Sequence, residues 1–305
     1  MNIKCITVTW LAKADLSSLN SGQGSGNINE LKLYSYGTKP YVSGQSLRTA
    51  LFQTMDRMYE GAIKCIPEAP CGDVENCWAC DLRGYLKPEE GTGGTRRWSP
   101  LKVSPALGQL PTEIVSDLLT RHSYIEKAED KKSKDQRIAH VQLTENVYKA
   151  SIVIDVVNIG RVVEPVIGSE KTKNSMEGWK EVVNIGDDER RVRIKAVLDS
   201  IFNLSGFAKQ ARAATSLAPQ LVFATIKKTY NQRGLNVLEL DDAGNAKLDL
   251  LESALYEAKT LGDEVFIGFT PGIIENEDEF KQVVGENGEE ILPVVEVFNR
   301  LKAKL

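Results

Sequence analysis

The sequence predicts a mixed fold, α+β or α/β, in which a core of sheet and helices carries long excursions. An alternating apolar pattern opens the chain, an apolar stripe with helical spacing follows over residues 41–61, and strands and helices recur beyond residue 139. With 305 residues, 42% of them hydrophobic, the chain is long enough for one elaborated domain or two small ones with a substantial core.

The first part of the chain predicts a strand, a loop and a helix. Residues 3–11 alternate closely enough to form a strand, whereas residues 15–29 are rich in Ser, Gly and Asn and predict a mobile loop. Over residues 41–61 apolar side chains recur every three or four positions, and Ser43 can cap the first turn. The residues of this stripe are Leu47, Ala50, Leu51, Met55 and Met58.

A change of composition over residues 62–138 predicts a long insertion, since this stretch holds four cysteines, several prolines, a Gly-rich patch and a charged run. Residues 139–159 then predict paired strands, because β-branched side chains are dense there. Residues 160–189 return to loop composition. The later predicted elements are a helix that starts at the acidic residues 187–189, a strand over 221–226, a helix over 246–261, a strand over 265–270 and a helix that opens at Pro293.

The charge is distributed unevenly. Residues 241–305 contain 15 acidic and 6 basic residues, a net charge of −9, whereas residues 1–240 contain 27 acidic and 32 basic residues, a net charge of +5. The overall charge of −4 therefore hides a mildly basic body behind an acidic C-terminal part. A basic body is compatible with a nucleic-acid partner.

Neither membrane insertion nor secretion is expected. No window approaches the run of about 18 apolar residues that a spanning helix needs, and the start of the chain lacks a small-residue cleavage site. Five cysteines, four of them crowded into residues 65–80, suit a local site in a reducing compartment, so we expect a cytoplasmic protein. With His122 and His140 as the only histidines, histidine-rich metal centres are excluded.

The predicted helix start is a candidate phosphate site. Backbone N–H groups at a helix N-terminus are unpaired and carry the positive end of the helix dipole, so residues 43–45 can hold a phosphate, with the guanidinium of Arg48 one turn further on. The alternative is an ordinary capped amphipathic helix with Arg48 in solvent.

The cysteines are a candidate metal site. Cys77 and Cys80 are two residues apart and can share one tetrahedral ion, and Cys65 and Cys71 would complete a closed structural zinc site. Free thiols and a redox pair remain as alternatives. Just after the cysteines, basic residues are interspersed with aromatic ones. This composition suits contact with single-stranded nucleic acid, and the alternative is a solvated surface loop. These residues are Arg83, Tyr85, Lys87, Arg96, Arg97, Trp98 and Lys102.

Two segments carry a resemblance to a known family. Residues 41–51, Tyr-Val-Ser-Gly-Gln-Ser-Leu-Arg-Thr-Ala-Leu, resemble the Cas-seven backbone subunits of type I CRISPR interference complexes (Cascade), most closely the DevR/Cst type of type I-B systems. Arg193 and residues 204–212, Leu-Ser-Gly-Phe-Ala-Lys-Gln-Ala-Arg, followed by Leu-Ala-Pro at 217–219, are similar to the family's basic turn.

The resemblance implies an α+β fold with an RNA-recognition-motif-like (ferredoxin-like) core over residues 1–61 and 139–240. Residues 62–138 would be a finger or web, residues 160–189 a thumb-like loop, and residues 241–305 an acidic part packing on the core. The implied function is antiviral defence by a multi-copy subunit, which forms a head-to-tail helical filament along the CRISPR RNA with other Cascade subunits and presents the guide to target DNA.

The resemblance also implies roles for individual residues. Those expected at the RNA backbone are Ser43, Gln45, Arg48, Lys209 and Arg212. An apolar wedge of the thumb is expected at Val163, Val166 and Ile167. One departure is that the strands at 151–157 and 221–226 offer a single aromatic residue, Phe223, for base stacking, so we expect the RNA to lie on loops and helix ends rather than on an open sheet face.

Catalysis is the main competing hypothesis. Related type III subunits cut RNA with an acidic residue after the first strand, and Asp15 occupies such a position. Metal-assisted cleavage is better supported by several convergent carboxylates, and residues 15–29 contain no second acid, so we expect a protein that is not an enzyme. A zinc-stapled scaffold that binds proteins and no RNA is a further alternative.

Overall fold

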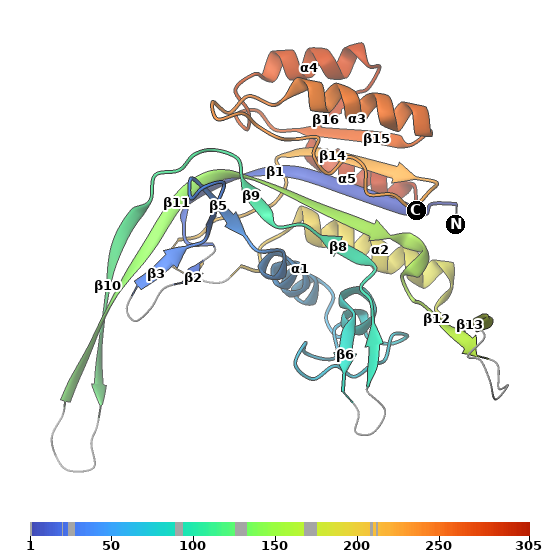
Figure 1. Cartoon of the computed structure of the whole chain (residues 1–305), viewed down its shortest axis with the longest axis horizontal. Coiled ribbons are helices and arrows are strands. Elements are labelled where there is room, and N and C mark those ends of the chain that lie inside the picture. Colours follow the sequence, from blue (N-terminus) through green and yellow to red (C-terminus); the bar gives the residue numbers. More distant parts are fainter. Residues whose placement is uncertain are drawn as a thin grey trace.

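The computed structural model describes residues 2–19, 21–23, 28–88, 94–125, 133–167, 176–207, 210–211 and 213–305. A large curved sheet with helices on both faces forms the body, and three hairpins project from it (Figure 1). No helix among these residues is both long and apolar enough to cross a membrane.

The helices are α1 (Gly44–Met58), α2 (Gly186–Phe202), α3 (Leu248–Leu261), α4 (Glu277–Glu286) and α5 (Val294–Ala303), with a π-helical turn η1 (Ala79–Arg83) and a 3-10 turn η2 (Val156–Asn158). The first strands are β1 (Cys5–Ser17), β2 (Ser21–Gln23), β3 (Ile28–Leu31), β4 (Leu33–Tyr34), β5 (Lys39–Val42), β6 (Tyr85–Lys87), β7 (Thr95–Arg97), β8 (Leu101–Val103) and β9 (Ala106–Gly108). The later strands are β10 (Val115–Ile125), β11 (Ser133–Asp155), β12 (Arg161–Ile167), β13 (Met176–Asn184), β14 (Leu221–Lys227), β15 (Glu264–Phe269) and β16 (Ile291–Leu292).

The main sheet is a mixed α+β arrangement centred on β1. Its strand order is β16-β15-β14-β1-β11-β9-β5-β4, and β8 and β10 also pair with β11. The pairs of β1 with β11 and with β14 are antiparallel, with Cys5 opposite both Asp155 and Lys227. Strand β1 is therefore covered on both edges, as its β-branched and aromatic composition favours.

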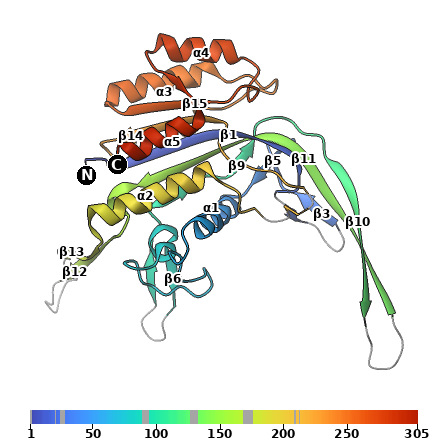
Figure 2. The same ribbon diagram turned by 180° about the vertical axis from the view of Figure 1, so that it is seen from behind.

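One face of this sheet packs against α1, α2 and α5. Alternate residues of β1, among them Ile6, Val8 and Trp10, point into this core and are fully buried. The indole N–H of Trp10 donates to the carbonyl of Leu217 at 2.9 Å, so the one polar atom of that side chain is satisfied. Figure 2 shows α1 and α2 together on one side of the sheet, and α3 and α4 on the other.

The second face of the sheet is sealed. Thr7 and Thr9 on β1 are buried; Thr7 shares a hydrogen bond of 2.6 Å with Thr225, and the Thr9 hydroxyl donates to the carbonyl of Gly234 at 3.1 Å. Phe223, with 1% of its surface exposed, packs in a second core together with α3 and α4. On this face the described strand residue Phe223 is buried, so it is not available for a base to stack on.

Several boundaries differ from those the sequence predicts. Residues 15–17 continue β1 rather than opening a loop. Within residues 160–189, the described residues 161–167 and 176–184 form the antiparallel pair β12 and β13, and α2 begins at Gly186. Residues 139–155 are not paired strands but the second part of one strand, β11, and the turn η2 follows. Strand β11 pairs with β10, inside the predicted insertion, up to Leu143 and with β1 from Thr144. The apolar residues of β10 are interrupted by polar ones and show no regular alternation, so the segment lacks a clear strand pattern, although its backbone pairs along the whole of its length.

The C-terminal part joins the body of the molecule. Strands β15 and β16 extend the main sheet, α5 packs in the first core and α4 in the second. The predicted strand at 265–270 and the helices at 246–261 and after Pro293 correspond to β15, α3 and α5, whereas α4 and β16 were not predicted.

Candidate nucleic-acid interface and metal centre

Helix α1 begins as the sequence predicts, with Ser43 as its N-cap. The Ser43 hydroxyl accepts a hydrogen bond from the backbone N–H of Ser46 at 3.2 Å, which satisfies one of the four unpaired donors of the first turn. That hydroxyl is thus engaged in the cap, while the side chain of Gln45 is exposed. The first turn lies against the segment after β8, because a Cβ added to Gly44 would be 3.1 Å from the carbonyl oxygen of Val103.

Arg48 lies half-buried one turn along α1, beside Arg83 from η1. The Nε of Arg48 is buried without a hydrogen-bond partner among the described residues. Burial lowers the pKa of Arg48, and repulsion from the Arg83 guanidinium lowers it further. The pKa of Arg83 is also lowered, first by burial. Attraction to Glu68 partly offsets the effect of burial on Arg83, whereas burial and the neighbouring cation both lower the pKa of Arg48, which creates a preference for an anion at Arg48.

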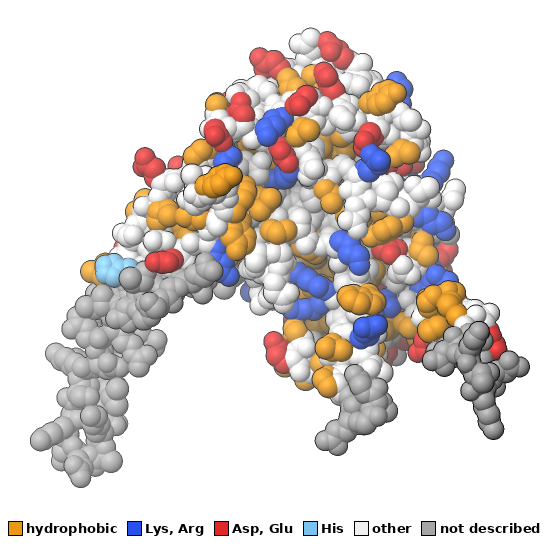
Figure 3. Space-filling view, in the orientation of Figure 1, with side chains coloured by type: hydrophobic (Ala, Val, Ile, Leu, Met, Phe, Trp, Pro, Cys, Tyr) orange, Lys and Arg blue, Asp and Glu red, His pale blue; other side chains and the backbone are white. Residues whose placement is uncertain are grey.

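These two arginines line an open hollow of about 480 Å³ between α1 and the segment from β6 to β8. No acidic side chain is among its described lining residues, which are Arg48, Arg83, Gly84, Tyr85, Arg97, Trp98, Ser99, Leu101, Lys102 and Val103. Figure 3 shows Lys and Arg side chains mixed with hydrophobic ones on this part of the surface, near the lower middle of the view. The combination suits a phosphate backbone with apolar neighbours.

A buried ion network around Asp81 holds the part of the chain that lines this hollow. Asp81 on η1 has no solvent exposure, and its carboxylate accepts hydrogen bonds from Arg97, from Arg193 at 2.7 Å and from the backbone N–H of Gly160 at 2.9 Å. Arg97 comes from β7, Arg193 from α2 and Gly160 from the turn before β12. One carboxylate therefore joins three parts of the chain that are distant in sequence.

The network gives Arg97 a structural role that the sequence alone does not indicate. Its guanidinium also donates to the carbonyls of Asn158 at 2.7 Å and Arg161 at 3.0 Å, so it is not a free cation for a ligand. Arg193 is 1% exposed and also donates to the carbonyl of Val74 at 2.9 Å, so its role is structural as well. Asp81 itself was missed, because nothing near it in the sequence shows that its partners lie on β7 and α2.

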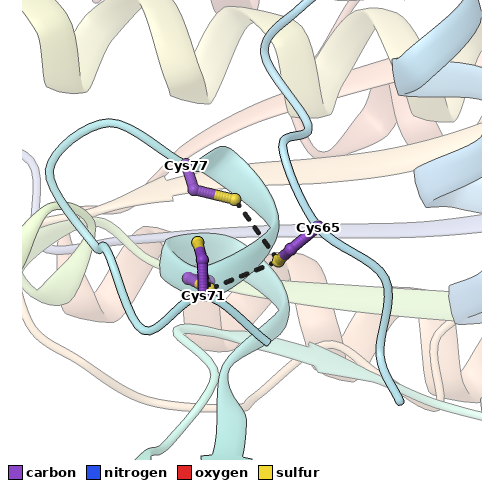
Figure 4. Close-up of side chains that lie close together, drawn as sticks. Cys65, Cys71 and Cys77 are labelled. Carbon is purple, nitrogen blue, oxygen red and sulfur yellow. Dashed lines mark hydrogen bonds between the residues drawn. The ribbon is translucent and has the colours of Figure 1, made fainter. Parts of the chain in front are cut away.

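The four clustered cysteines are brought together as predicted. The Sγ atoms of Cys65, Cys71, Cys77 and Cys80 all lie within 4.8 Å of one another, and none forms a disulfide. The Cys65 sulfur is 3.5 Å from those of Cys77 and Cys80, and the Cys71 sulfur is 3.4 Å from that of Cys80 (Figure 4). Four thiolates around a tetrahedral ion with bonds of about 2.3 Å would lie about 3.8 Å apart, so the set can hold a metal ion.

The environment of Cys77 also suits a metal ligand. Burial raises the pKa of the Cys77 thiol, but hydrogen bonds from the backbone at Cys80 and Lys64 and from neighbouring thiols lower it overall. The pKa values of Cys65 and Cys80 are raised, first by burial and also by the charge on Cys77. Among the described residues this is the one group of three or more Cys, His, Asp or Glu side chains that could hold a metal. In particular, Asp15 is exposed near the end of β1 and belongs to no such group.

The second predicted RNA-binding segment lies directly against α1. A Cβ on Gly206 would be 2.4 Å from the carbonyl oxygen of Ala50, so only glycine permits this approach, and the N–H of Ser205 donates to the Thr54 hydroxyl at 3.1 Å. Two residues expected to contact RNA from this segment, Lys209 and Arg212, lie outside the described residues.

The residues predicted to form a wedge lie on β12. Val163 is half-buried and Val166 is exposed, with 37% of its surface accessible. The backbone of Ile167 pairs with Met176, and the side chain of Ile167 lies outside the described ones. The structure therefore places Val163 and Val166 on a projecting hairpin.

Comparison with known proteins gives one family and a set of related folds. The model of the family described as CRISPR-associated negative auto-regulator DevR/Csa2 matches residues 8–242. Among solved structures, a chain of a "CRISPR RNA-guided surveillance complex" shares 15% identity with a TM-score of 0.57, covering 98% of this chain and 99% of the other. A chain of a "CRISPR RNA-guided surveillance complex, pre-nicking" shares 11% identity with a TM-score of 0.60, again covering 98% of this chain and 99% of the other. At these identities the two structures show a shared fold. No curated protein matches.

Replacing Asp81 tests the buried network. We expect Asp81→Ala to lower the free energy of unfolding by about 3–5 kcal/mol, because Arg97 and Arg193 lose a buried counter-ion. Urea denaturation followed by circular dichroism measures the change. Asp188→Ala is the control, since that carboxylate is exposed and pairs with Arg191 at the surface. Equal stability of the two variants would contradict a structural role for Asp81.

Proposed function

Because the chain belongs to the CRISPR-associated DevR/Csa2 family and is a Cas-seven type backbone subunit of a type I CRISPR complex, we propose that it binds CRISPR RNA through the hollow beside α1. The observation that carries this proposal is the pair of Arg48 and Arg83, two cations beside one another in a hollow whose described lining contains no carboxylate. RNA phosphates supply the missing negative charge.

The proposed interface extends along α1. The unpaired N–H groups of its first turn and the exposed Gln45 would contact a further phosphate, while the Ser43 hydroxyl stays in the cap. Gly206, which precedes Lys209 and Arg212 in the sequence, packs on Ala50 of the same helix, which supports the proposal that both segments contact one RNA strand. Such contacts are independent of sequence, as a carrier of many different guides requires.

The central strands support an RNA-recognition-motif-like (ferredoxin-like) core. Strands β14, β1, β11 and then β8 or β9 lie side by side and antiparallel, and α1 and α2 pack on one face of them. With the other face sealed by α3, α4 and the chain before them, the RNA would lie beside this core, at helix ends and loops.

Copies of the subunit would assemble head to tail along the RNA, together with other Cascade subunits in the cytoplasm. A heterologous contact that does not close produces a helical filament. The acidic residues 241–305 would meet the basic body of the next copy, and the β12–β13 hairpin would act as the thumb, with Val163, Val166 and Ile167 as its wedge. The guide held in this way would pair with target DNA.

We also assign the cysteine cluster to zinc with a structural role. Four thiolates favour zinc over harder cations, and they leave no open position for a reaction. The apolar cluster in this region is small. Zinc would join the loop that carries Cys65, Cys71 and Cys77 to Cys80 on η1. The ion would thereby hold Asp81 and Arg83 in place, because they lie one and three residues after Cys80 on that turn.

Substitution of Arg48 tests the RNA interface. We expect Arg48→Ala to weaken binding of a labelled single-stranded RNA several-fold and to reduce the slope of log K against log salt by about 0.7, since one phosphate contact is lost. Fluorescence anisotropy at several salt concentrations measures both quantities. Arg57→Ala is the matched control, because Arg57 is exposed in the last turn of the same helix. An equal effect of the two substitutions would show that α1 contributes only general positive charge.

Removal of the metal tests the zinc site. The purified protein is expected to contain about one zinc ion per chain by elemental analysis, and chelation is expected to lower its melting temperature. Cys77→Ser should lose the ion, whereas Cys5→Ser should keep it, because Cys5 is buried apart from the cluster with its sulfur 3.4 Å from the carbonyl of Asn231. Absence of zinc together with free reaction of all four thiols would exclude this assignment.

Asp15 tests the enzymatic alternative. We propose that the subunit is not an enzyme, so the assembled complex with magnesium should leave a complementary RNA intact, and Asp15→Ala should change nothing. Gel electrophoresis of the labelled RNA measures this. If the wild-type complex degrades the RNA in the presence of metal and the Asp15→Ala complex does not, the subunit is a ribonuclease.

A further inference from the structure

An aromatic side chain stands exposed at the edge of the basic hollow. Trp98 follows β7 and leaves 77% of its surface exposed, although indole rings are usually covered. Its ring lies 5.5 Å from the guanidinium carbon of Arg96, a cation–π contact that keeps positive charge beside it. Among the described residues the indole N–H has no hydrogen-bond partner, so its polar edge is available to solvent or to a ligand.

Trp98 lies between two hollows. It lines both the hollow of about 480 Å³ with Arg48 and Arg83 and a second one of about 270 Å³ on the side of η2 and β12. Asp155 is the carboxylate among the described lining residues of the second hollow, and it accepts a hydrogen bond of 2.6 Å from Asn158. Space for a planar group is therefore present beside the ring, with cations on both sides.

The backbone on either side of Trp98 is fixed. Arg97 is held by Asp81, and the hydroxyl of Ser99 donates to the carbonyls of Leu82 at 2.7 Å and Leu101 at 2.8 Å. A Cβ on Gly84 would lie 2.5 Å from the carbonyl oxygen of Arg97, so the two segments are in close contact. An exposed ring on a rigid support loses little conformational entropy when a ligand stacks on it.

We propose that Trp98 is a stacking platform for an unpaired nucleobase, and that the phosphates next to this base occupy the hollow with Arg48 and Arg83. This inference rests on the proposed function and adds a base contact to a site otherwise described by its phosphates. Stacking on an aromatic ring tolerates any base, so the contact is compatible with guides of any sequence. The strand that supplies the base is either the RNA or a single strand of DNA, which share this chemistry.

Strands with and without bases test the proposal. The probes are a single-stranded RNA, a DNA of the same length, and an abasic DNA that keeps the phosphates but lacks bases. Trp98→Ala should weaken binding of the RNA or the DNA about tenfold and leave the abasic affinity unchanged, while Trp98→Phe should retain most of the affinity. Trp179→Ala is the control, because Trp179 is also exposed, at 64%, but lies on β13.

The outcomes separate this inference from the proposed function. A loss confined to the RNA assigns the base to the guide, and a loss confined to the DNA assigns it to a target strand; both support the platform. If Arg48→Ala weakens binding of the abasic strand but Trp98→Ala changes no affinity, the platform is wrong and the phosphate site stands. If the wild-type protein binds none of the probes, both are wrong. Loss of self-association in Trp98→Ala with unchanged strand affinity assigns the ring to a contact between copies and overturns the platform.

Discussion

The charge balance around Asp81 is the constraint on which the rest of the site depends. A carboxylate without contact to water is unfavourable by several kcal/mol unless it is paired and hydrogen-bonded. Two guanidiniums and a backbone N–H meet that requirement, and each comes from a different part of the chain. The segment that carries Asp81 therefore has one arrangement in which its charge is satisfied, and in that arrangement it lies against α2 and the turn before β12.

Three functions meet on the short turn η1. Cys80 belongs to the thiol cluster, Asp81 to the ion network, and Arg83 to the wall of the basic hollow. Because the three are almost consecutive, a shift of any one displaces the others. This explains how a segment with a small apolar core of its own can present cations at fixed positions.

Periodicity predicted the parts of the fold that are governed by local burial. The stripe of α1 with its Ser43 cap, the strand β14 and the helix after Pro293 all follow from apolar spacing and capping chemistry. The local pattern at α4, with acidic residues before the buried Phe280, Val283 and Val284, is also that of a helix start. The four cysteines were predicted as a group because their spacing is short.

The features that the sequence did not reveal depend on contacts between residues that are far apart in the sequence. Nothing local distinguishes Asp81 from a surface acid, and its partner Arg193 is 112 positions away. The pairing of β10 with β11 was hidden for a similar reason, because β10 has no regular alternation of apolar and polar residues and its partner strand lies elsewhere in the chain. The exposure of Trp98 likewise follows from the three-dimensional support beneath it and from no motif.

The length of β11 has a mechanical consequence. Its 23 residues run without interruption from the pairing with β10 in the projecting hairpin to the pairing with β1 at the centre of the sheet, a contour of roughly 75 Å. A force applied to the outer end of this hairpin acts as a torque on the central strands, because no joint separates the two parts of β11. A neighbouring molecule that binds the hairpin would therefore transmit force directly to β1 at the centre of the subunit.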